Sequence, residues 1–230
     1  MKSGLPMIEH QFIPGAILAG GRGTRMGGNK PLQRLAGRRL IDHVIDRVKP
    51  QVSELALSIA QDCAWATTFE LPVVQDAFPG QPGPLAGIYS VMAWVAERQP
   101  HAKALFVTTA DSPFIPRSLI SILLHAHEAN GSMVFTKYGN LQFPAIGIWP
   151  LSCMEALRRW LIAELTGLAP KPFLSGKTWT VVDFSGTRHD PLANLNTRED
   201  LARAEVLLPT ITEDYKFSIG VHPPPGGQIP

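Results

Sequence analysis

LAGGRGTRMGGNK, residues 18–30, follows directly on the first apolar run of the chain, residues 16–19. The apolar run is typical of a short buried strand, and the glycines behind it break it into a loop. Glycines let backbone N–H groups converge without interference from a Cβ atom, so a loop of this kind closes around phosphate oxygens. Arg25 and Lys30 supply the positive charge that a polyphosphate needs. The stretch therefore indicates a nucleotide-binding loop.

Two common nucleotide-binding motifs do not fit this loop. A P-loop needs Gly, four residues, Gly and then Lys-Ser/Thr; Gly23 and Gly28 have that separation, but Asn29 occupies the lysine position. A Rossmann fingerprint needs G-x-G-x-x-G, and Met26 occupies its third glycine position. The remaining pattern, LAGG-x-G-T-R-M-G-x-x-K-P-L, resembles the opening motif of nucleotidyltransferases that make nucleoside-diphosphate conjugates.

Bulk composition narrows the class of protein. A chain of 230 residues is long enough for one large domain with its own core. The formal net charge of +2 gives no basic stripe for nucleic acid, which favours a small-molecule substrate. No apolar stretch is long enough to span a bilayer, and residues 1–14 have no apolar signal region. Because Cys63 and Cys153 are isolated, we expect a cytoplasmic protein.

Short apolar runs alternate with amphipathic stretches along the chain. Strands are expected at residues 16–19, 55–59, 104–108, 132–136, 145–149 and 179–182, and helices at 40–48, 84–96, 117–129, 151–165 and 197–207. Alternation of this kind predicts an α/β fold with a mostly parallel central sheet. Ligands of such sheets bind at the carboxyl ends of the strands.

The domain organisation is expected to be simple. Residues 1–208 show no internal repeat and no linker, so they form a single domain. Residues 209–230 form a Pro/Gly-rich C-terminal tail, whose ending HPPPGGQIP cannot sustain a helix or a central strand. We expect this tail to be flexible or to lie as a strap over the surface.

Asp111 directly follows the predicted strand 104–108, within the sequence TADSPF. A carboxylate at the tip of a strand is where an α/β enzyme holds Mg²⁺ against the phosphates of a nucleotide. The alternative is that Asp111 caps the next helix or fixes the turn before Pro113. The glycine-rich loop in the same chain favours the metal role.

Asp76 ends another apolar run, LPVVQD, just before a Pro/Gly-rich loop. The residues leave three ligands open for its carboxylate: a base, a ribose hydroxyl or a metal-bound water. A simple turn-forming role is equally open. The following sequence GPLAG, residues 83–87, predicts a close-packing turn that flanks the nucleoside, with Pro84 in the first turn of a helix.

Asn194 and Asn196 alternate with apolar residues near the end of the chain, so both point to the same side of an extended segment. Thr197 and Asp200 have the spacing of a capping pair for the last helix. Asn196 therefore either belongs to this local structure or reaches the site.

Taken in order, four motifs resemble the bacterial molybdenum cofactor guanylyltransferase family. They are residues 18–32, residues 73–76 with 82–87, residues 111–116 and residues 194–197. The resemblance covers nearly the whole chain and implies a Rossmann-like three-layer α/β/α sandwich. It also implies transfer of GMP from Mg·GTP to the terminal phosphate of molybdopterin, with pyrophosphate as the leaving group. Transient contacts with cofactor-biosynthesis proteins and apo-molybdoenzymes are implied as well.

The resemblance also implies roles for individual residues. Arg25, Lys30 and Asp111 would be catalytic, with Asp111 as the ligand of Mg²⁺ and Arg25 neutralising the transferring phosphoryl group. The nucleotide would be bound by Leu18, Ala19, Gly20, Gly21, Lys30, Ser58, Asp76, Gly87 and Asp111. The second substrate would be bound by Asn194 and Asn196. No covalent protein intermediate is needed, because positioning and charge neutralisation supply most of the catalysis.

The chain departs from the family pattern at Asn29, Ser58 and Phe143, where aspartate, asparagine and histidine are usual. Two alternatives stay open. A cytidylyltransferase of the same superfamily, acting on molybdopterin or another small phosphate, keeps the same loop, because its spacing reads phosphates and not bases. A non-catalytic module that binds a nucleotide or pterin is motivated by the three departures.

Overall fold

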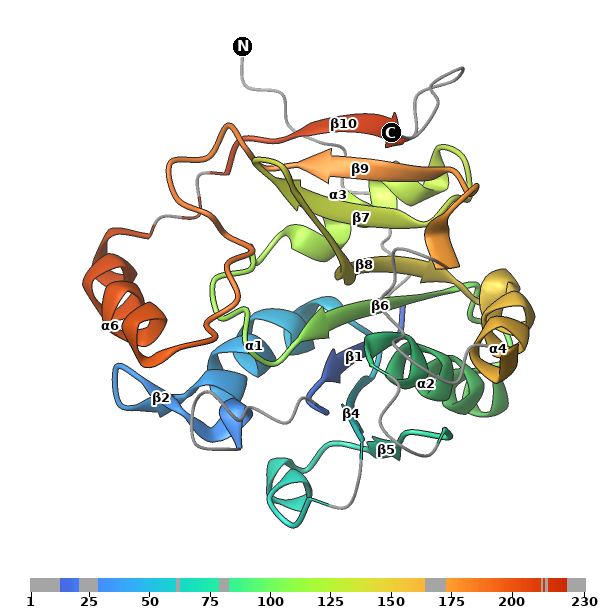
Figure 1. Cartoon of the computed structure of the whole chain (residues 1–230), viewed down its shortest axis with the longest axis horizontal. Coiled ribbons are helices and arrows are strands. Elements are labelled where there is room, and N and C mark those ends of the chain that lie inside the picture. The colour runs from blue at the N-terminus through green and yellow to red at the C-terminus, as the bar shows by residue number, and fades with distance from the viewer. Residues whose placement is uncertain are drawn as a thin grey trace.

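The computed structural model describes residues 13–20, 29–60, 63–78, 83–163, 173–211, 213 and 215–222. One sheet contains β1 (Gly15–Leu18), β4 (Leu55–Ile59), β5 (Val73–Gln75), β6 (Ala104–Thr109), β7 (Val134–Tyr138), β8 (Leu141–Pro150), β9 (Trp179–Asp183) and β10 (Ser218–His222). Their spatial order is β10-β9-β7-β8-β6-β1-β4-β5 (Figure 1). A separate two-stranded hairpin contains β2 (Arg34–Leu35) and β3 (Arg38–Arg39).

The helices of the described chain are α1 (Leu40–Val48), α2 (Pro84–Arg98), α3 (Leu119–Glu128), α4 (Met154–Ala163) and α6 (Arg198–Leu207). Short 3-10 turns are η2 (Lys30–Leu32), η3 (Lys49–Gln51), η4 (Ala66–Phe69), η5 (Leu151–Cys153) and η6 (Leu208–Thr210). The expected bounds of α1 match the observed ones, because its apolar residues recur with helical period on one buried face. Within the described ranges, no helix is both long and apolar enough to cross a membrane.

The central sheet is mostly parallel, as predicted. β1 pairs in parallel with β4 and β6, β4 pairs in parallel with β5, and β7 pairs in parallel with β9. Only β8 and β10 run against their neighbours. The carboxyl ends of the parallel strands therefore lie on one side of the sheet, called here the carboxyl edge. In Figure 1 the arrowheads of β6 and β9 point to this side, where α6 and the β2–β3 hairpin lie.

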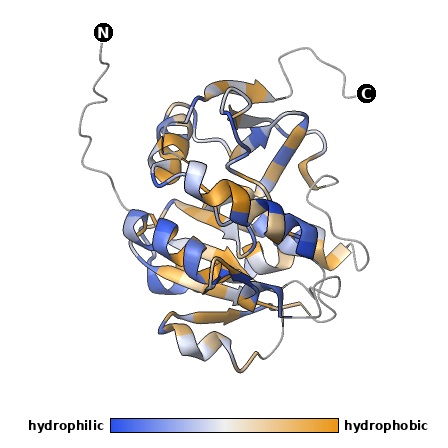
Figure 2. Cartoon of the chain, turned by 90° about the vertical axis from the view of Figure 1, so that its left-hand side faces the viewer, coloured by the Kyte–Doolittle hydropathy of each residue, from blue (hydrophilic) through white to orange (hydrophobic). Residues whose placement is uncertain are grey.

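Helices cover both faces of the sheet. One apolar core packs α1 and α3 against the strands through residues such as Val44 and Leu123. The opposite core packs α2 and α4 through residues such as Ile88 and Leu157. In Figure 2 the helices carry both hydrophilic and hydrophobic segments, as expected for elements with one buried face. The structure confirms the predicted three-layer α/β/α fold.

A third, smaller core lies beside the carboxyl edge of the sheet. It joins the β2–β3 hairpin, the start of α1, the segment after β6 and α6 through Leu35, Leu40, Phe114, Leu195 and Ala204. These elements are far apart in sequence. The core therefore fixes α6 and the residues before it against the hairpin that follows the glycine-rich loop.

Strand β8 begins earlier than the sequence predicts. We expected residues 145–149, because proline cannot donate to a strand ladder, but β8 starts at Leu141 and includes Pro144. The β7–β8 register shifts between Phe135 and Thr136, which places Pro144 at an irregularity of the ladder. A bulge of this kind accommodates a residue without an N–H donor.

Part of the segment 209–230 forms regular structure that the sequence analysis did not anticipate. β10 pairs antiparallel with β9 at the edge of the sheet. Along it Phe217, Ile219 and Val221 are 42%, 46% and 47% exposed. The proline-rich ending, residues 223–230, lies outside the described residues.

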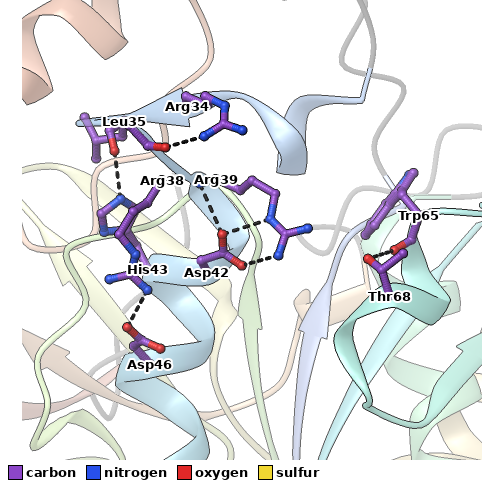
Figure 3. Close-up of polar contacts among 10 residues, drawn as sticks. Arg34, Leu35, Arg38, Arg39, Asp42, His43, Asp46, Trp65 and Thr68 are labelled. Atoms are coloured by element: carbon purple, nitrogen blue, oxygen red, sulfur yellow. Dashed lines mark hydrogen bonds and ion pairs between the residues drawn. The ribbon is translucent and has the colours of Figure 1, made fainter.

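Polar contacts tie the β2–β3 hairpin to α1 (Figure 3). Arg39 donates to both carboxylate oxygens of Asp42, at 2.8 and 2.9 Å, and His43 Nε2 lies 3.0 Å from the carbonyl oxygen of Leu35. The Arg39 guanidinium also stacks on the ring of Phe69, 4.3 Å from its centroid. One arginine thus links the segments after β1 and after β4.

Replacing Ala36 with glycine is expected to stabilise the protein. Ala36 and Gly37 form the two-residue turn between β2 and β3 with φ of 49° and 80°, the conformation that matches the twist of a hairpin. This left-handed conformation costs an alanine about 1 kcal/mol, so the free energy of unfolding measured in urea should rise by about 0.5 kcal/mol.

The matched control is Ala202→Gly at an exposed position inside α6. There the same change should lower the free energy of unfolding by about 1 kcal/mol. Equal destabilisation by both substitutions would show that the turn at Ala36 stores no strain.

Candidate active site

The candidate nucleotide-binding and metal-binding residues lie at the ends of neighbouring strands, along the carboxyl edge of the sheet. Leu18 closes β1, Ser58 lies in β4, Asp76 follows β5 and Asp111 follows β6. Backbone hydrogen bonds hold these ends in register, including Ala19 N–H to the Ser58 carbonyl at 2.8 Å. The order β6-β1-β4-β5 therefore arranges the candidate residues in a line across four neighbouring strands.

Lys30 lies at the centre of a charged cluster at the carboxyl ends of these strands. Its ammonium donates to Asp111 Oδ2 in a short ion pair, and to Asn196 Oδ1 at 2.6 Å. The side chains of Lys30 and Asp111 are only 13% and 16% exposed. Partial burial strengthens such a pair relative to one in bulk water. The fold thus unites three predicted residues that lie far apart in sequence.

Asp111 offers a carboxylate oxygen of the kind that coordinates a magnesium ion. Its second oxygen, Oδ1, is buried and has no hydrogen-bond partner among the described residues. A hard carboxylate oxygen suits Mg²⁺, whose remaining positions are filled by phosphate oxygens and water. In the described ranges, no group of three or more His, Cys, Asp or Glu side chains could hold a metal ion. The residues present fit a phosphate-bound Mg²⁺.

Asn194 reaches the same loop through a different partner. Its Oδ1 accepts a hydrogen bond from Ser112 Oγ at 2.6 Å, and Ser112 Oγ lies 2.9 Å from Thr109 Oγ1. Between the two asparagines, Leu195 N–H donates to the Asp111 carbonyl at 2.9 Å, and its side chain enters the third core. The extended segment before α6 is therefore fastened directly to the loop after β6.

Asp76 lies in a second polar cluster, beside β5, the last strand at that side of the sheet. Ser58 Oγ donates to Asp76 Oδ1 at 3.5 Å. A Cβ atom added at Gly87 would lie 2.6 Å from Ser58 Oγ, 3.3 Å from Asp76 Oδ1 and 3.3 Å from Leu18 Cδ2. An alanine here would therefore displace the Ser58 hydroxyl. Burial raises the pKa of Asp76 to about 6, and the hydrogen bond from Ser58 offsets part of that effect.

The backbone at the start of the glycine-rich loop is tightly packed. A Cβ atom at Gly20 would lie 2.9 Å from the backbone nitrogen of Ala60, so a larger residue would push β1 and β4 apart. Gly21 and Arg25 lie outside the described residues. At the far end of the loop, Asn29 has φ 46° and ψ 44°, a left-handed conformation that asparagine and aspartate adopt more readily than other residues. Asparagine is therefore a conservative replacement for aspartate there.

Thr197 forms the predicted cap. Its side chain accepts a hydrogen bond from the Asp200 N–H at 3.1 Å, and Asp200 accepts from the Thr197 N–H at 2.8 Å. The backbone N–H of Asn196 also donates to Asp200, at 2.8 Å. Asn196 thus has both of the roles that the sequence left open, because its backbone joins the cap while its side chain reaches Lys30.

The contacts of Ser112 and Arg39 were not predicted from the sequence. Ser112 directly follows Asp111 in the TADSPF motif, and this position next to a candidate ligand could have indicated a role at the site. The contact of Arg39 with Phe69 has no such signal, because the two residues belong to separate loops of no recognisable pattern.

Comparison with known proteins gives a consistent result at the level of sequence. Residues 15–174 match the family model of the MobA-like NTP transferase domain. A protein of Bradyrhizobium sp. (strain ORS 278) named molybdenum cofactor guanylyltransferase is 40% identical over 85% of this chain and 92% of its own length. A protein of the same name from Rhodopseudomonas palustris (strain BisB5) is 37% identical over 87% of this chain and 96% of its own.

Solved structures share the fold. The molybdopterin-guanine dinucleotide biosynthesis protein A of Archaeoglobus fulgidus superposes with a TM-score of 0.69 at 22% identity, covering 86% of this chain and all of its own. The 4-diphosphocytidyl-2C-methyl-D-erythritol synthase of Anaerococcus prevotii gives 0.64 at 14% identity, covering 86% of this chain and 96% of its own. At these identities the similarity concerns the fold alone.

Asp76→Asn is expected to stabilise the free protein at neutral pH. Because the folded state raises the pKa of Asp76 to about 6, its ionisation disfavours folding as pH rises toward and past that value. Urea unfolding should show the variant to be more stable by about 1–2 kcal/mol at pH 7.5, after allowance for solvent screening, with the gain lost as the pH falls from about 6 to about 4.

Asp183→Asn provides a control of opposite sign. Burial works to raise the pKa of Asp183, but hydrogen bonds from Lys137 and Ser185 outweigh it and hold the pKa below its usual value. Its ionised form therefore stabilises the fold above the unfolded pKa, so the variant's loss of stability relative to the wild type should be larger at pH 7.5 than at pH 3. A pH-independent effect of Asp76→Asn would contradict the assignment of a buried ionised carboxylate.

Proposed function

Since this chain belongs to the MobA-like NTP transferase family, we propose that it is a molybdenum cofactor guanylyltransferase. It transfers GMP from GTP to the terminal phosphate of molybdopterin and releases pyrophosphate. The relatives that share this name are 32–40% identical to the chain over most of their length. One structural observation supports this chemistry most directly. At the carboxyl edge of the sheet, the Lys30 ammonium donates hydrogen bonds to both Asp111 and Asn196.

The reaction requires little covalent chemistry from the protein. An oxygen of the terminal phosphate of molybdopterin attacks the α-phosphorus of GTP, and the bond from that phosphorus to the bridging oxygen of pyrophosphate breaks. Two anions must therefore approach each other, so positioning and charge neutralisation dominate the catalysis. On this proposal, Lys30 neutralises phosphate charge and Asp111 holds Mg²⁺. When bound, Mg²⁺ screens the phosphates and orients them.

The nucleotide is assigned to the half of the edge formed by β1, β4 and β5. Its binding residues on this proposal are Leu18, Ala19, Gly20, Ser58, Asp76 and Gly87. Gly21 joins them from the sequence pattern, and Arg25 adds positive charge at the transferring phosphoryl group. Asn194 and Asn196 are assigned to molybdopterin, because their side chains contact Ser112 and Lys30, beside Asp111, and not the cluster around Asp76.

The names of the relatives favour GTP over CTP, so the cytidylyltransferase and the binding-module alternatives are not preferred. The same proposal includes a cytoplasmic location and handover of the product to apo-molybdoenzymes. It keeps residues 1–208 in one domain, and β10 (Ser218–His222) belongs to the same domain because it pairs with β9.

Burial raises the pKa of the Cys153 thiol to about 11, which keeps that thiol unreactive at neutral pH.

Asp111→Ala is expected to abolish pyrophosphate release. The assay supplies molybdopterin and Mg²⁺ with either GTP or CTP and measures pyrophosphate. The wild-type protein should release it with GTP, and the variant should be slower by a factor of about 10²–10³, because it loses the ligand of the metal.

The control is Asp46→Ala, which removes an exposed carboxylate that pairs with Arg38 on the outer side of α1. It should keep wild-type activity. Undiminished release by Asp111→Ala would refute the metal role, and release with CTP in preference to GTP would refute the choice of base.

Asn196→Ala is expected to weaken binding of molybdopterin. Loss of an amide that hydrogen-bonds a charged group should raise the KM for molybdopterin about tenfold, while the KM for GTP changes much less. Steady-state kinetics with Glu199→Ala, an exposed neighbour, serves as the comparison. An equal rise in both KM values would assign Asn196 to the support of Lys30 and not to the second substrate.

A further inference from the structure

After α6, the chain returns to contact the loop that follows β6. Glu213 Oε2 accepts a hydrogen bond from the Arg117 N–H at 3.1 Å. The Tyr215 hydroxyl donates to the Phe114 carbonyl at 3.4 Å. Glu213 and Tyr215 are called here the C-terminal strap. Both of these contacts fall on the backbone a few residues after the candidate metal ligand Asp111.

Arg47 of α1 links the strap to the same loop. Its side chain is only 13% exposed, and a guanidinium so far removed from water needs an acceptor of opposite charge. Its Nη1 donates to Glu213 Oε1 at 2.8 Å and to the Ile115 carbonyl at 3.0 Å. No other carboxylate in the described ranges pairs with Arg47. Glu213 therefore holds Arg47 in the orientation that fixes the carbonyl of Ile115.

The residues between these contacts and Asp111 are closely packed. All of residues 112–115 are buried, and Pro113 fixes its own φ angle. A close-packed, buried run passes on a displacement instead of absorbing it. On the other side of the loop, the Asp111 carbonyl accepts from the Leu195 N–H at 2.9 Å. The position of the Asp111 carboxylate thus depends on how both sides of the loop are held.

The position of a metal ligand matters because Mg²⁺ demands near-ideal octahedral geometry, with its oxygen ligands at about 2.0–2.1 Å. Groups that hold a ligand in place therefore contribute to metal affinity without touching the metal. Glu213 is a group of this kind, because its partners are Arg47 and Arg117 and not a residue of the charged cluster around Lys30.

We propose that Glu213 is a positioning residue for Asp111. Through Arg47 and the backbone of Arg117 it holds the loop after β6, and so keeps the Asp111 carboxylate where it binds the Mg²⁺ that accompanies the nucleotide. This inference rests on the metal role of Asp111 in the proposed function. It gives the C-terminal segment a part in substrate binding, although that segment lies outside the four motifs recognised in the sequence.

The test measures how much Mg²⁺ strengthens GTP binding, with no catalysis involved. Isothermal titration without molybdopterin gives the dissociation constant of GTP in EDTA and in excess Mg²⁺, and the first divided by the second is called here the metal gain. Asp111→Ala should remove most of the metal gain, because it removes the ligand. No metal gain in the wild-type protein, or an unchanged gain in Asp111→Ala, would overturn the metal role and this inference with it.

Glu213→Ala should reduce the metal gain about tenfold and leave the dissociation constant of GTP in EDTA unchanged. The measurement is made at a temperature where circular dichroism shows the variant to be fully folded. Glu213→Gln keeps one of the two acceptor oxygens, so it should fold and show an intermediate loss. A wild-type metal gain in both variants, together with a reduced gain in Asp111→Ala, would overturn the inference and leave the proposed function intact.

Glu54→Ala is the matched control. Glu54 also has two partners, since it accepts from Gln99 Nε2 at 3.0 Å and pairs with Arg98 at 3.7 Å. It precedes β4, so it lies at the opposite end of the parallel strands from Asp111. This variant should melt at a lower temperature but keep the wild-type metal gain. An equal fall of the metal gain in Glu54→Ala and Glu213→Ala would indicate a general loosening of the fold and would overturn the inference.

Discussion

The ammonium group of Lys30 holds the site together. Its partners, Asp111 and Asn196, lie 81 and 166 residues away in sequence. A charge with so little exposure is stable only when it is paired, so the loop after β1, the loop after β6 and the segment before α6 must converge on it. On the proposed function, this pairing keeps the ammonium neutralised and in position before a triphosphate binds.

Apolar packing beneath the cluster makes this convergence possible. Leu35 and Leu40 follow Lys30 closely, Phe114 follows Asp111, and Leu195 precedes Asn196, and all four pack in the third core. Each polar residue of the cluster therefore has an apolar neighbour in one shared core. Small domains position functional groups in this way because hydrophobic contacts, unlike surface ion pairs, are strong enough to fix loops.

Much of this arrangement was predictable from sequence, and the reasons are specific. Helix α1 and the Thr197 cap follow from local periodicity and capping chemistry. The approach of Lys30 to Asp111 follows from the rule that parallel strands end at one edge. The bond from Ser112 to Asn194 spans 82 residues and depends on side-chain positions that no local pattern encodes. Similarly, β10 forms because β9 offers a free edge, which is a property of the folded sheet.

The two polar clusters of the candidate site have separate supports. Asp76 and Gly87 pack around Ser58, whereas Asn194 and Asn196 are held by Ser112 and Lys30. No hydrogen bond or ion pair in the described chain joins one cluster to the other. On the proposed function, a substitution in one cluster can therefore change the binding of one substrate while the contacts of the other cluster stay in place.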